Sequence, residues 1–304
     1  MNQKYKDILK KLYVLIPLKK YLYIIARSAG ISKYNVYTKL TFNGKYSIRI
    51  ASKKLKIYST GGSIENEIFW KGLGSTWESE TLWIWKLLCG KSKIIFDIGA
   101  NTGMYSLIAK TINPSATVIA FEPSVKTYNT LLKNCRINNY DIIAEKIALS
   151  NATGNTTFYD VFEDNQKSAS LSPDKLKNFS GYRGEINEYI VKSTTLADYI
   201  KQNNISRIDL MKIDVELHEP EVIEGFGEYL LLYNPIIIVE ILTDEVADKI
   251  NSLFKNTNYL IYHLEGPHKM KRVEKMYVEH QKWNFLLCPK ASVAEFKLTE
   301  YITG

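Results

Sequence analysis

The sequence has few cysteines, no CxxC pair and no apolar run long enough to cross a membrane. Its three cysteines, Cys89, Cys135 and Cys288, lie far apart, which argues against a secreted disulfide framework and against a structural zinc site. Such sparse use of cysteine is typical of a reducing compartment, so we expect a cytoplasmic protein. The apolar stretch Leu12–Leu18 is interrupted by Pro17 and followed by two lysines, and we therefore expect neither a secretory signal nor a membrane span there.

Acidic residues are almost missing from the first 60 residues. This segment holds 14 lysines and arginines against one acid, Asp7, for a formal charge of +13. The other 244 residues hold 26 of the 40 basic residues and 31 of the 32 acidic residues, for a formal charge of −5. A basic segment on a mildly acidic body suggests contact between that segment and a polyanion, either nucleic acid or an anionic membrane surface.

The basic segment contains two different hydrophobic patterns. Residues 2–28 alternate basic and apolar side chains at the three- and four-residue spacing of an amphipathic helix, interrupted at Pro17. Such a helix can lie in a membrane interface, or it can pack on the body with its lysines in solvent. Period-two alternation on both sides of Asn43-Gly44 then predicts a β-hairpin of residues 36–42 and 46–50, with a third strand over 54–58. We expect residues 1–75 to form this helical and β-hairpin extension, and residues 76–304 to form the main domain.

From residue 93 onward, short apolar strands alternate with helical patterns. Seven strands are predicted for one sheet, over residues 94–98, 117–121, 142–148, 210–215, 235–241, 259–264 and 284–288. This order predicts an α/β fold with a doubly wound, mostly parallel sheet. Because ligands of such sheets bind at the carboxyl ends of the strands, the residues that follow these strands are the candidates for a site.

The first strand of this sheet ends in Asp97, and a turn with two glycines follows it. Gly99 and Gly103 allow a tight turn and close approach of a ligand, but their spacing differs from the GxGxxG that binds a pyrophosphate. Asp97 would repel a diphosphate and suits a ligand with an ammonium or sulfonium group. Glu122, at the end of the second strand and 25 residues after Asp97, fits an acceptor for two ribose hydroxyls. These features point to S-adenosylmethionine; the alternative is that the glycines serve only a tight strand–helix connection.

Three blocks of this sequence resemble one family. They are FDIGANTGMYS at 96–106, FEP at 121–123 and KIDVELHEPEVIEG at 212–225. The blocks resemble the FkbM-type S-adenosylmethionine-dependent methyltransferases, over about residues 78–290. The family commonly carries glycine where this chain has Leu217. The resemblance implies a Rossmann-like methyltransferase sheet, O-methylation of a sugar or another hydroxylated product, and a cofactor site lined by Asp97, Gly99, Asn101, Gly103, Glu122 and Pro123.

Acidic residues and a histidine follow the fourth strand, where we expect the catalytic groups. Methyl transfer to a hydroxyl needs aligned reacting atoms and a base for the hydroxyl proton. His218 is the first candidate because its ordinary pKa lies near neutrality, and Asp214 is the alternative base or the group that orients the acceptor. Glu216 is a third candidate. Each has a structural alternative, namely helix capping for His218 and a solvated strand end for the acids. The spacing does not require a metal, and we expect none.

We therefore expect an S-adenosylmethionine-dependent O-methyltransferase acting on a saccharide, a glycan or another hydroxylated metabolite. A nicotinamide-dependent oxidoreductase is the alternative enzyme, disfavoured by Asp97 and by the missing GxGxxG. A nucleic-acid-binding protein using the basic segment is the alternative outside enzymes. Because no nucleic-acid-binding motif is visible, we expect no nucleic-acid partner. Residues 1–28 are the candidate for peripheral association with an anionic inner-membrane surface, and the sequence does not indicate an oligomeric state.

Overall fold

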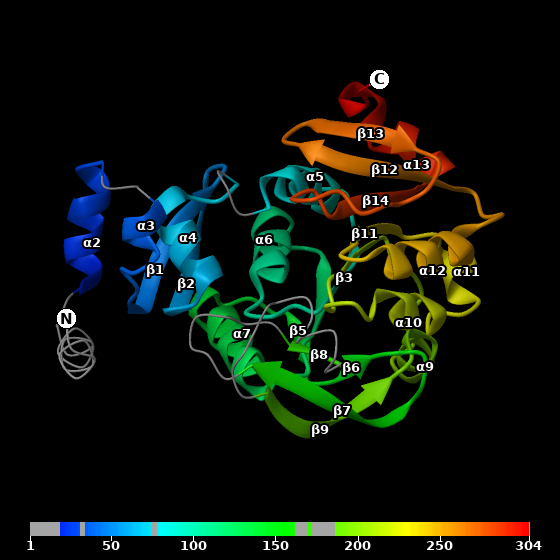
Figure 1. The fold of residues 1–304 in the computed structure, drawn as a ribbon, viewed down its shortest axis with the longest axis horizontal. Coiled ribbons are helices and arrows are strands. Elements are labelled where there is room, and N and C mark those ends of the chain that lie inside the picture. The colour runs from blue at the N-terminus through cyan, green and yellow to red at the C-terminus, as the bar shows by residue number, and fades with distance from the viewer. Residues whose placement is uncertain (1–18, 31–33, 75–77, 162–168, 172–185, 304) are drawn as a thin grey trace.

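A sheet of eight strands forms the centre of the molecule (Figure 1). The computed structural model describes residues 19–30, 34–74, 78–161, 169–171 and 186–303. The strand order is β13-β12-β14-β11-β10-β3-β4-β5, in which β11, β10, β3, β4 and β5 pair in parallel and the other neighbours pair antiparallel. The strands are β3 (Ile94–Ile98), β4 (Thr117–Phe121), β5 (Ile143–Glu145), β10 (Leu210–Ile213), β11 (Ile236–Glu240), β12 (Tyr259–Gly266), β13 (Lys269–Val273) and β14 (Asn284–Pro289).

The predicted doubly wound, mostly parallel α/β sheet is confirmed, with eight strands where seven were expected. The additional strand, β13, folds back on β12 at the edge of the sheet. Met270 is its one fully buried residue, and its sequence KMKRV is largely basic. An edge strand with a single buried side chain has no apolar run that the sequence could reveal.

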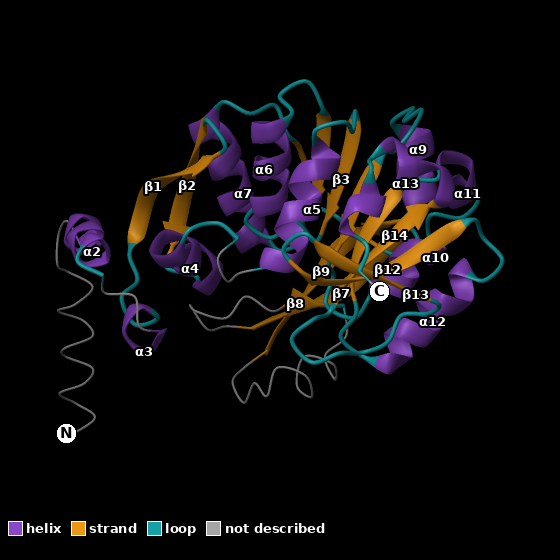
Figure 2. Ribbon diagram, turned by 90° about the horizontal axis from the view of Figure 1, so that it is seen from above, coloured by secondary structure: helices purple, strands orange, loops and turns teal. Residues whose placement is uncertain are grey.

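Helices cover both faces of the sheet, as Figure 2 shows. Side chains of neighbouring strand residues point to opposite faces, so along β10 Leu210 joins one hydrophobic cluster and Met211 joins the other. The first cluster contains residues of α5 (Ser79–Cys89), α6 (Met104–Ile112) and α13 (Lys290–Glu295). The second contains residues of α9 (Leu196–Gln202), α10 (Glu219–Glu224), α11 (Tyr229–Tyr233) and α12 (Asp244–Phe254). Burial on both faces explains why the central strands are almost continuously apolar.

A smaller sheet of four strands stands beside the main one, in the order β6-β9-β7-β8. Its strands are β6 (Ala148–Leu149), β7 (Gly154–Val161), β8 (Ala169–Ser170) and β9 (Ile186–Thr194). The single strand expected over 142–148 is thus divided between β5 of the main sheet and β6 of this one. The polar sequence of β9 gave no strand prediction, since only its last residues and Val191 are buried.

The N-terminal extension contains a hairpin, but the expected position of its turn was wrong. The hairpin joins β1 (Asn43–Ile50) to β2 (Lys53–Thr60), so Asn43-Gly44 begins a strand instead of forming the turn. Residues 34–37 form the short helix α3 (Tyr34–Tyr37). Tyr37 and Phe42 pack on Trp70 and Phe69, with ring centroids 6.2 and 4.8 Å apart. Burial of these aromatic rings outweighs the local turn preference.

The predicted N-terminal helix is present as α2 (Lys19–Ser28), and residues 1–18 lie outside the described residues. A further helix, α4 (Ser63–Lys71), follows the hairpin. The hairpin lies along α7 (Val125–Asn138), where the side chain of Asn134 accepts a hydrogen bond of 2.8 Å from the Tyr58 N–H. The expected boundary at 75/76 falls among residues 75–77, outside the described ones, and the division into two domains stays a prediction. No helix in the described ranges has the length and apolar character to cross a bilayer.

Candidate functional site

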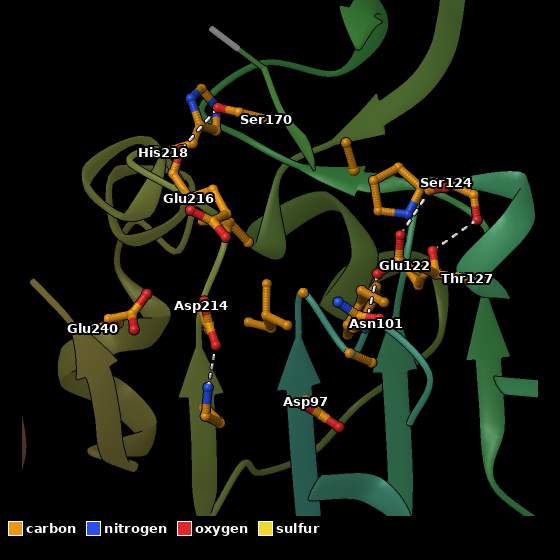
Figure 3. A pocket seen from close by; sticks show the side chains of 18 of the residues that line it. Asp97, Asn101, Glu122, Ser124, Thr127, Ser170, Asp214, Glu216, His218 and Glu240 are labelled. Atoms are coloured by element: carbon orange, nitrogen blue, oxygen red, sulfur yellow. Dashed lines mark hydrogen bonds and ion pairs between the residues drawn. The ribbon is translucent and has the colours of Figure 1, made fainter. Parts of the chain in front are cut away.

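A cavity of about 500 Å³ lies at the carboxyl ends of β3, β4 and β10. Figure 3 shows Glu122 and Asn101 on one side of it and Asp214, Glu216 and Glu240 on the other. Of the nine residues proposed from the sequence, the structure brings eight to the cavity wall: Asp97, Gly99, Asn101, Glu122, Pro123, Asp214, Glu216 and His218. The ninth, Gly103, is not among the residues that line the cavity.

The glycine turn between β3 and α6 needs glycine for two different reasons. Gly99 has a φ of +79°, and a Cβ there would lie 1.8 Å from the carbonyl oxygen of Asp214. The turn therefore touches the end of β10 directly. Gly103 has a φ of +87°, and its Cβ would lie 2.3 Å from Leu131 Cδ1 on α7. Gly99 thus shapes the cavity, while Gly103 packs the turn against a helix.

Glu122 is tied to the glycine turn. Its carboxylate accepts hydrogen bonds from the backbone N–H groups of Asn101 at 2.7 Å and Ser124 at 2.9 Å. Burial raises the pKa of Glu122 to about 7, although these hydrogen bonds act in the opposite direction. Asn101 adopts the left-handed conformation, with a φ of 51°. Its side-chain oxygen is buried and has no hydrogen-bond partner among the described residues. Buried polar atoms normally have a partner, so this oxygen is suited to accept a hydrogen bond from a ligand.

Asp97 lies deeper in the wall than the sequence indicated. Its Oδ2 accepts hydrogen bonds from the N–H of Ser106 at 2.8 Å and from the Ser106 hydroxyl at 2.6 Å. Asp97 is therefore also a structural group that holds the first turn of α6 against β3. Burial raises its pKa above the ordinary value.

Lys212 is a site residue that sequence reasoning did not single out. It is buried on β10, in register with Asp97 of β3. Its ammonium donates a hydrogen bond of 2.6 Å to Asp214 Oδ2, lies 4.0 Å from Glu78 Oε2 and sits 4.4 Å from the ring centre of Tyr105. Burial by itself would lower the pKa of Lys212, but the neighbouring carboxylates outweigh it and hold the pKa above its usual value. In the sequence, the sign that could have identified Lys212 is a lysine within the otherwise apolar strand LMKI.

Three further carboxyl groups surround this ion pair. Glu78, at the start of α5, accepts a hydrogen bond from the Tyr105 hydroxyl, and burial raises its pKa to about 7. Glu240, at the end of β11, has its pKa raised by burial and then by the charge of Asp214. Burial and Asp214 likewise raise the pKa of Glu216 to about 8. This side of the cavity therefore holds one ammonium among four carboxyl groups. No group of three or more possible ligands in the described ranges is arranged to hold a metal ion.

The loop after β10 adopts an unusual backbone conformation. Glu216 and Leu217 have φ values of 56° and 77°. A side chain at such a φ costs about 1–2 kcal/mol, which glycine would avoid. The Leu217 side chain is buried in the second hydrophobic cluster, and Glu219 accepts hydrogen bonds from the N–H groups of Val215 and Leu217 at 3.0 and 3.2 Å. Burial of the Leu217 side chain and the two hydrogen bonds to Glu219 offset the strain of this backbone conformation.

His218 contributes to the cavity wall at the N-terminal cap of α10. Its Nε2 lies 3.0 Å from the Ser150 hydroxyl, and its Nδ1 lies 3.4 Å from Glu221 Oε2. Both ring nitrogens therefore have structural neighbours. Figure 3 shows the ring above Glu216, at the side of the cavity that borders Ser170.

Residues 97–261 match the model of the methyltransferase FkbM domain. The match covers more than half of the chain. The chain belongs to the FkbM methyltransferase family. Within this family it is 30% identical over 152 residues to 31-O-demethyl-FK506 methyltransferase FkbM of Streptomyces tacrolimicus, covering 43% of this chain and 58% of that protein. It is also 26% identical over 148 residues to hexuronic acid methyltransferase AglP of Haloferax volcanii, covering 49% and 55%. The matched region thus spans little more than half the length of these relatives.

A solved FkbM methyltransferase from Methylobacillus flagellatus aligns with 64% of this chain and 43% of its own, at 13% identity and a TM-score of 0.43. The FkbM-domain match begins at Asp97 and ends in β12. It includes the glycine turn, Glu122 and the loop after β10. Glu78 lies before it, so α5 adds a carboxyl group to the cavity from outside the matched segment.

Proposed function

We propose that this FkbM-family protein is an S-adenosylmethionine-dependent O-methyltransferase. Its acceptor would be a hydroxyl group of a saccharide, a glycan or another hydroxylated metabolite. One observation carries the proposal: a single cavity joins the glycine turn and Glu122 on one side to the Asp214 cluster on the other. A cofactor and an acceptor bound on these two sides would meet at the carboxyl ends of β3 and β10.

The residues on the first side fit this cofactor. The Glu122 carboxylate can accept hydrogen bonds from ribose hydroxyls beyond those it receives from the backbone, because a carboxylate has about four lone-pair sites. The buried, unpartnered oxygen of Asn101 adds an acceptor for a donor group of the ligand. The wall carries carboxyl groups where a diphosphate would need hydrogen-bond donors, which disfavours a nicotinamide cofactor. When bound, S-adenosylmethionine would supply a methyl group on a cationic sulfur.

Asp214 is the best-placed group to receive the acceptor proton. The 2.6 Å bond from Lys212 fixes its carboxylate at the cavity wall, where it can hold an acceptor hydroxyl in line with the methyl donor. Glu216 is a weaker candidate because a pKa of about 8 keeps it protonated near neutral pH. His218 would first have to exchange its contacts with Ser150 and Glu221. We therefore place Asp214 first, with His218 and Glu216 as the other candidate bases.

The acceptor class rests on the relatives and on the charge of the wall. One relative is named for methylation of a hexuronic acid, and the other for an O-methyl position. In this protein four carboxyl groups surround one ammonium. A neutral hydroxylated acceptor fits such a wall better than a uronate, since a further buried carboxylate would add to the burial and mutual repulsion that already keep Glu216 protonated near neutral pH.

Two measurements test the proposal. The first compares equilibrium binding of S-adenosylhomocysteine and NAD, with Asp97→Ala expected to abolish binding of the former. Tight binding of NAD alone would exclude the proposed cofactor. The second follows labelled methyl groups from S-adenosylmethionine into glycan, lipid, small-molecule and nucleic-acid fractions of a host extract, with Asp214→Asn as the inactive control. Label in nucleic acid, or equal transfer by Asp214→Asn, would contradict the assigned acceptor class or base.

A further inference from the structure

A second cavity, of about 290 Å³, lies in the N-terminal extension between α2 and the β1–β2 hairpin. In Figure 1 these elements occupy the end of the molecule opposite β12 and β13. The lining residues come from α2, both strands of the hairpin and α4: Lys20, Ile24, Arg27, Lys45, Tyr46, Ser47, Lys56 and Phe69.

Four cationic residues line this cavity: Lys20 and Arg27 from α2, Lys45 from β1 and Lys56 from β2. Among the described residues, their side-chain hydrogen bonds reach backbone oxygens, such as Lys20 Nζ to the Lys45 carbonyl at 3.1 Å and Lys56 Nζ to the Ile137 carbonyl at 3.2 Å. None of the four forms an ion pair with a carboxylate in the described part of the chain. Residues 19–60 contain no aspartate or glutamate at all. The cavity is therefore suited to an anion with several oxygen acceptors, such as a phosphate.

Helix α2 also exposes apolar side chains that do not line the cavity. Tyr21, Leu22 and Ile25 are 55%, 56% and 67% exposed, although Tyr23 of the same helix is buried against Trp70. Single exposed apolar residues are ordinary, but these three share one side of a ten-residue helix whose Lys20 and Arg27 line the cavity, which makes α2 amphipathic. A nucleic-acid backbone would use the cations but not the aliphatic side chains. An anionic lipid surface uses both.

We propose that this face docks on an anionic phospholipid membrane. The cavity binds the phosphate of a lipid headgroup through Lys20, Lys45 and Lys56, while Leu22 and Ile25 enter the interface. This inference is independent of the proposed catalytic activity, because none of these residues lines the active-site cavity. It would hold the protein against a membrane without a spanning helix.

The test is cosedimentation of the full chain with vesicles of phosphatidylcholine alone or mixed with phosphatidylglycerol. We expect the protein to sediment only with the mixed vesicles. Lys20→Gln/Lys45→Gln/Lys56→Gln should weaken this binding by at least about tenfold, since each basic residue near an anionic surface contributes to it. Leu22→Ser/Ile25→Ser should weaken it as well.

Matched controls carry the same changes elsewhere. Lys255→Gln/Lys290→Gln/Lys297→Gln removes three exposed charges, and Leu231→Ser/Leu232→Ser removes two apolar residues of α11 that are 55% and 66% exposed. Both should bind vesicles like the unmodified protein. If the triple lysine variant does not fold, judged by thermal unfolding, Lys45→Gln/Lys56→Gln changes only exposed residues and replaces it.

Equal binding to both kinds of vesicle, no binding to either, or equal losses in the controls would overturn the proposal. Binding of inorganic phosphate without binding to either kind of vesicle would indicate a site for free phosphate. A preference for single-stranded RNA over the mixed vesicles would assign the surface to nucleic acid instead. Binding of S-adenosylhomocysteine, measured on the same variants, should not change. Failure of docking is thereby distinguished from failure of the proposed activity.

Discussion

Replacing Glu122 with glutamine tests the proposed cofactor side of the cavity. The substitution keeps the size of the side chain and removes its charge. In the structure, the two carboxylate oxygens accept backbone hydrogen bonds from Ser124 and Asn101 and remain open to further donors from the cavity. Because a glutamine amide accepts through one oxygen only, the variant also leaves one of these two backbone N–H groups without its acceptor.

The expected loss of affinity follows from the bonds that a ribose would make. A hydrogen bond to a charged group contributes about 1.5–3 kcal/mol, so weakening two of them costs about 3 kcal/mol. This corresponds to roughly a hundredfold higher Kd for S-adenosylhomocysteine.

The pH dependence should change as well. Burial raises the pKa of Glu122 in the folded protein from 4.5 to about 7, so its neutral form stabilises the fold. This stabilisation is fully present below about pH 4.5 and is lost as the pH rises through about 7. Ribose hydroxyls prefer the carboxylate, and affinity for S-adenosylhomocysteine should therefore rise with pH through the same range. Because glutamine does not titrate, the Glu122→Gln variant should lack the contribution of residue 122 to the pH dependence of both stability and affinity.

Titration calorimetry at about pH 6 and about pH 8, with thermal unfolding at both, measures these effects. Glu145→Gln is the matched control, because Glu145 is the last residue of the neighbouring strand β5 and does not line the cavity. If Glu122→Gln bound S-adenosylhomocysteine as tightly as the unmodified protein at the higher pH, Glu122 would not be the ribose acceptor.

Three other substitutions probe the remainder of the cavity. Gly99→Ala places a Cβ 1.8 Å from the Asp214 carbonyl oxygen and should abolish binding of S-adenosylhomocysteine, whereas Gly227→Ala, also at positive φ but with open space around it, should not. Lys212→Met leaves Asp214 without its buried partner and should lower the free energy of unfolding by about 3 kcal/mol and reduce kcat; an unchanged unfolding midpoint would show that the pair is not important for the fold. His218→Ala should leave cofactor binding intact and slow turnover less than about tenfold, and a loss beyond about a hundredfold in single-turnover rate would identify His218 as the base in place of Asp214.

Much of the fold follows from local pattern. The strands 94–98 and 117–121 have the bounds predicted for them, because each is a short apolar run flanked by clear helix and turn signals. β13 and β9 were missed, since strands that bury few side chains leave little periodicity. The hairpin turn was misplaced because Asn43-Gly44 is a strong local signal that distant aromatic packing overrides.

The amino-acid sequence by itself predicted the residues that line the proposed cofactor side of the cavity. Asp97, the glycine turn and Glu122 each follow a strand within one short segment, and parallel strands bring their carboxyl ends to the same edge of the sheet. Tertiary structure alone decided the other side. Lys212 meets Glu78 of α5 across more than a hundred residues of chain, and α2 meets the hairpin to form the basic cavity. Charges so distant in sequence interact only after the backbone folds, because electrostatic energy depends on separation in space and on burial.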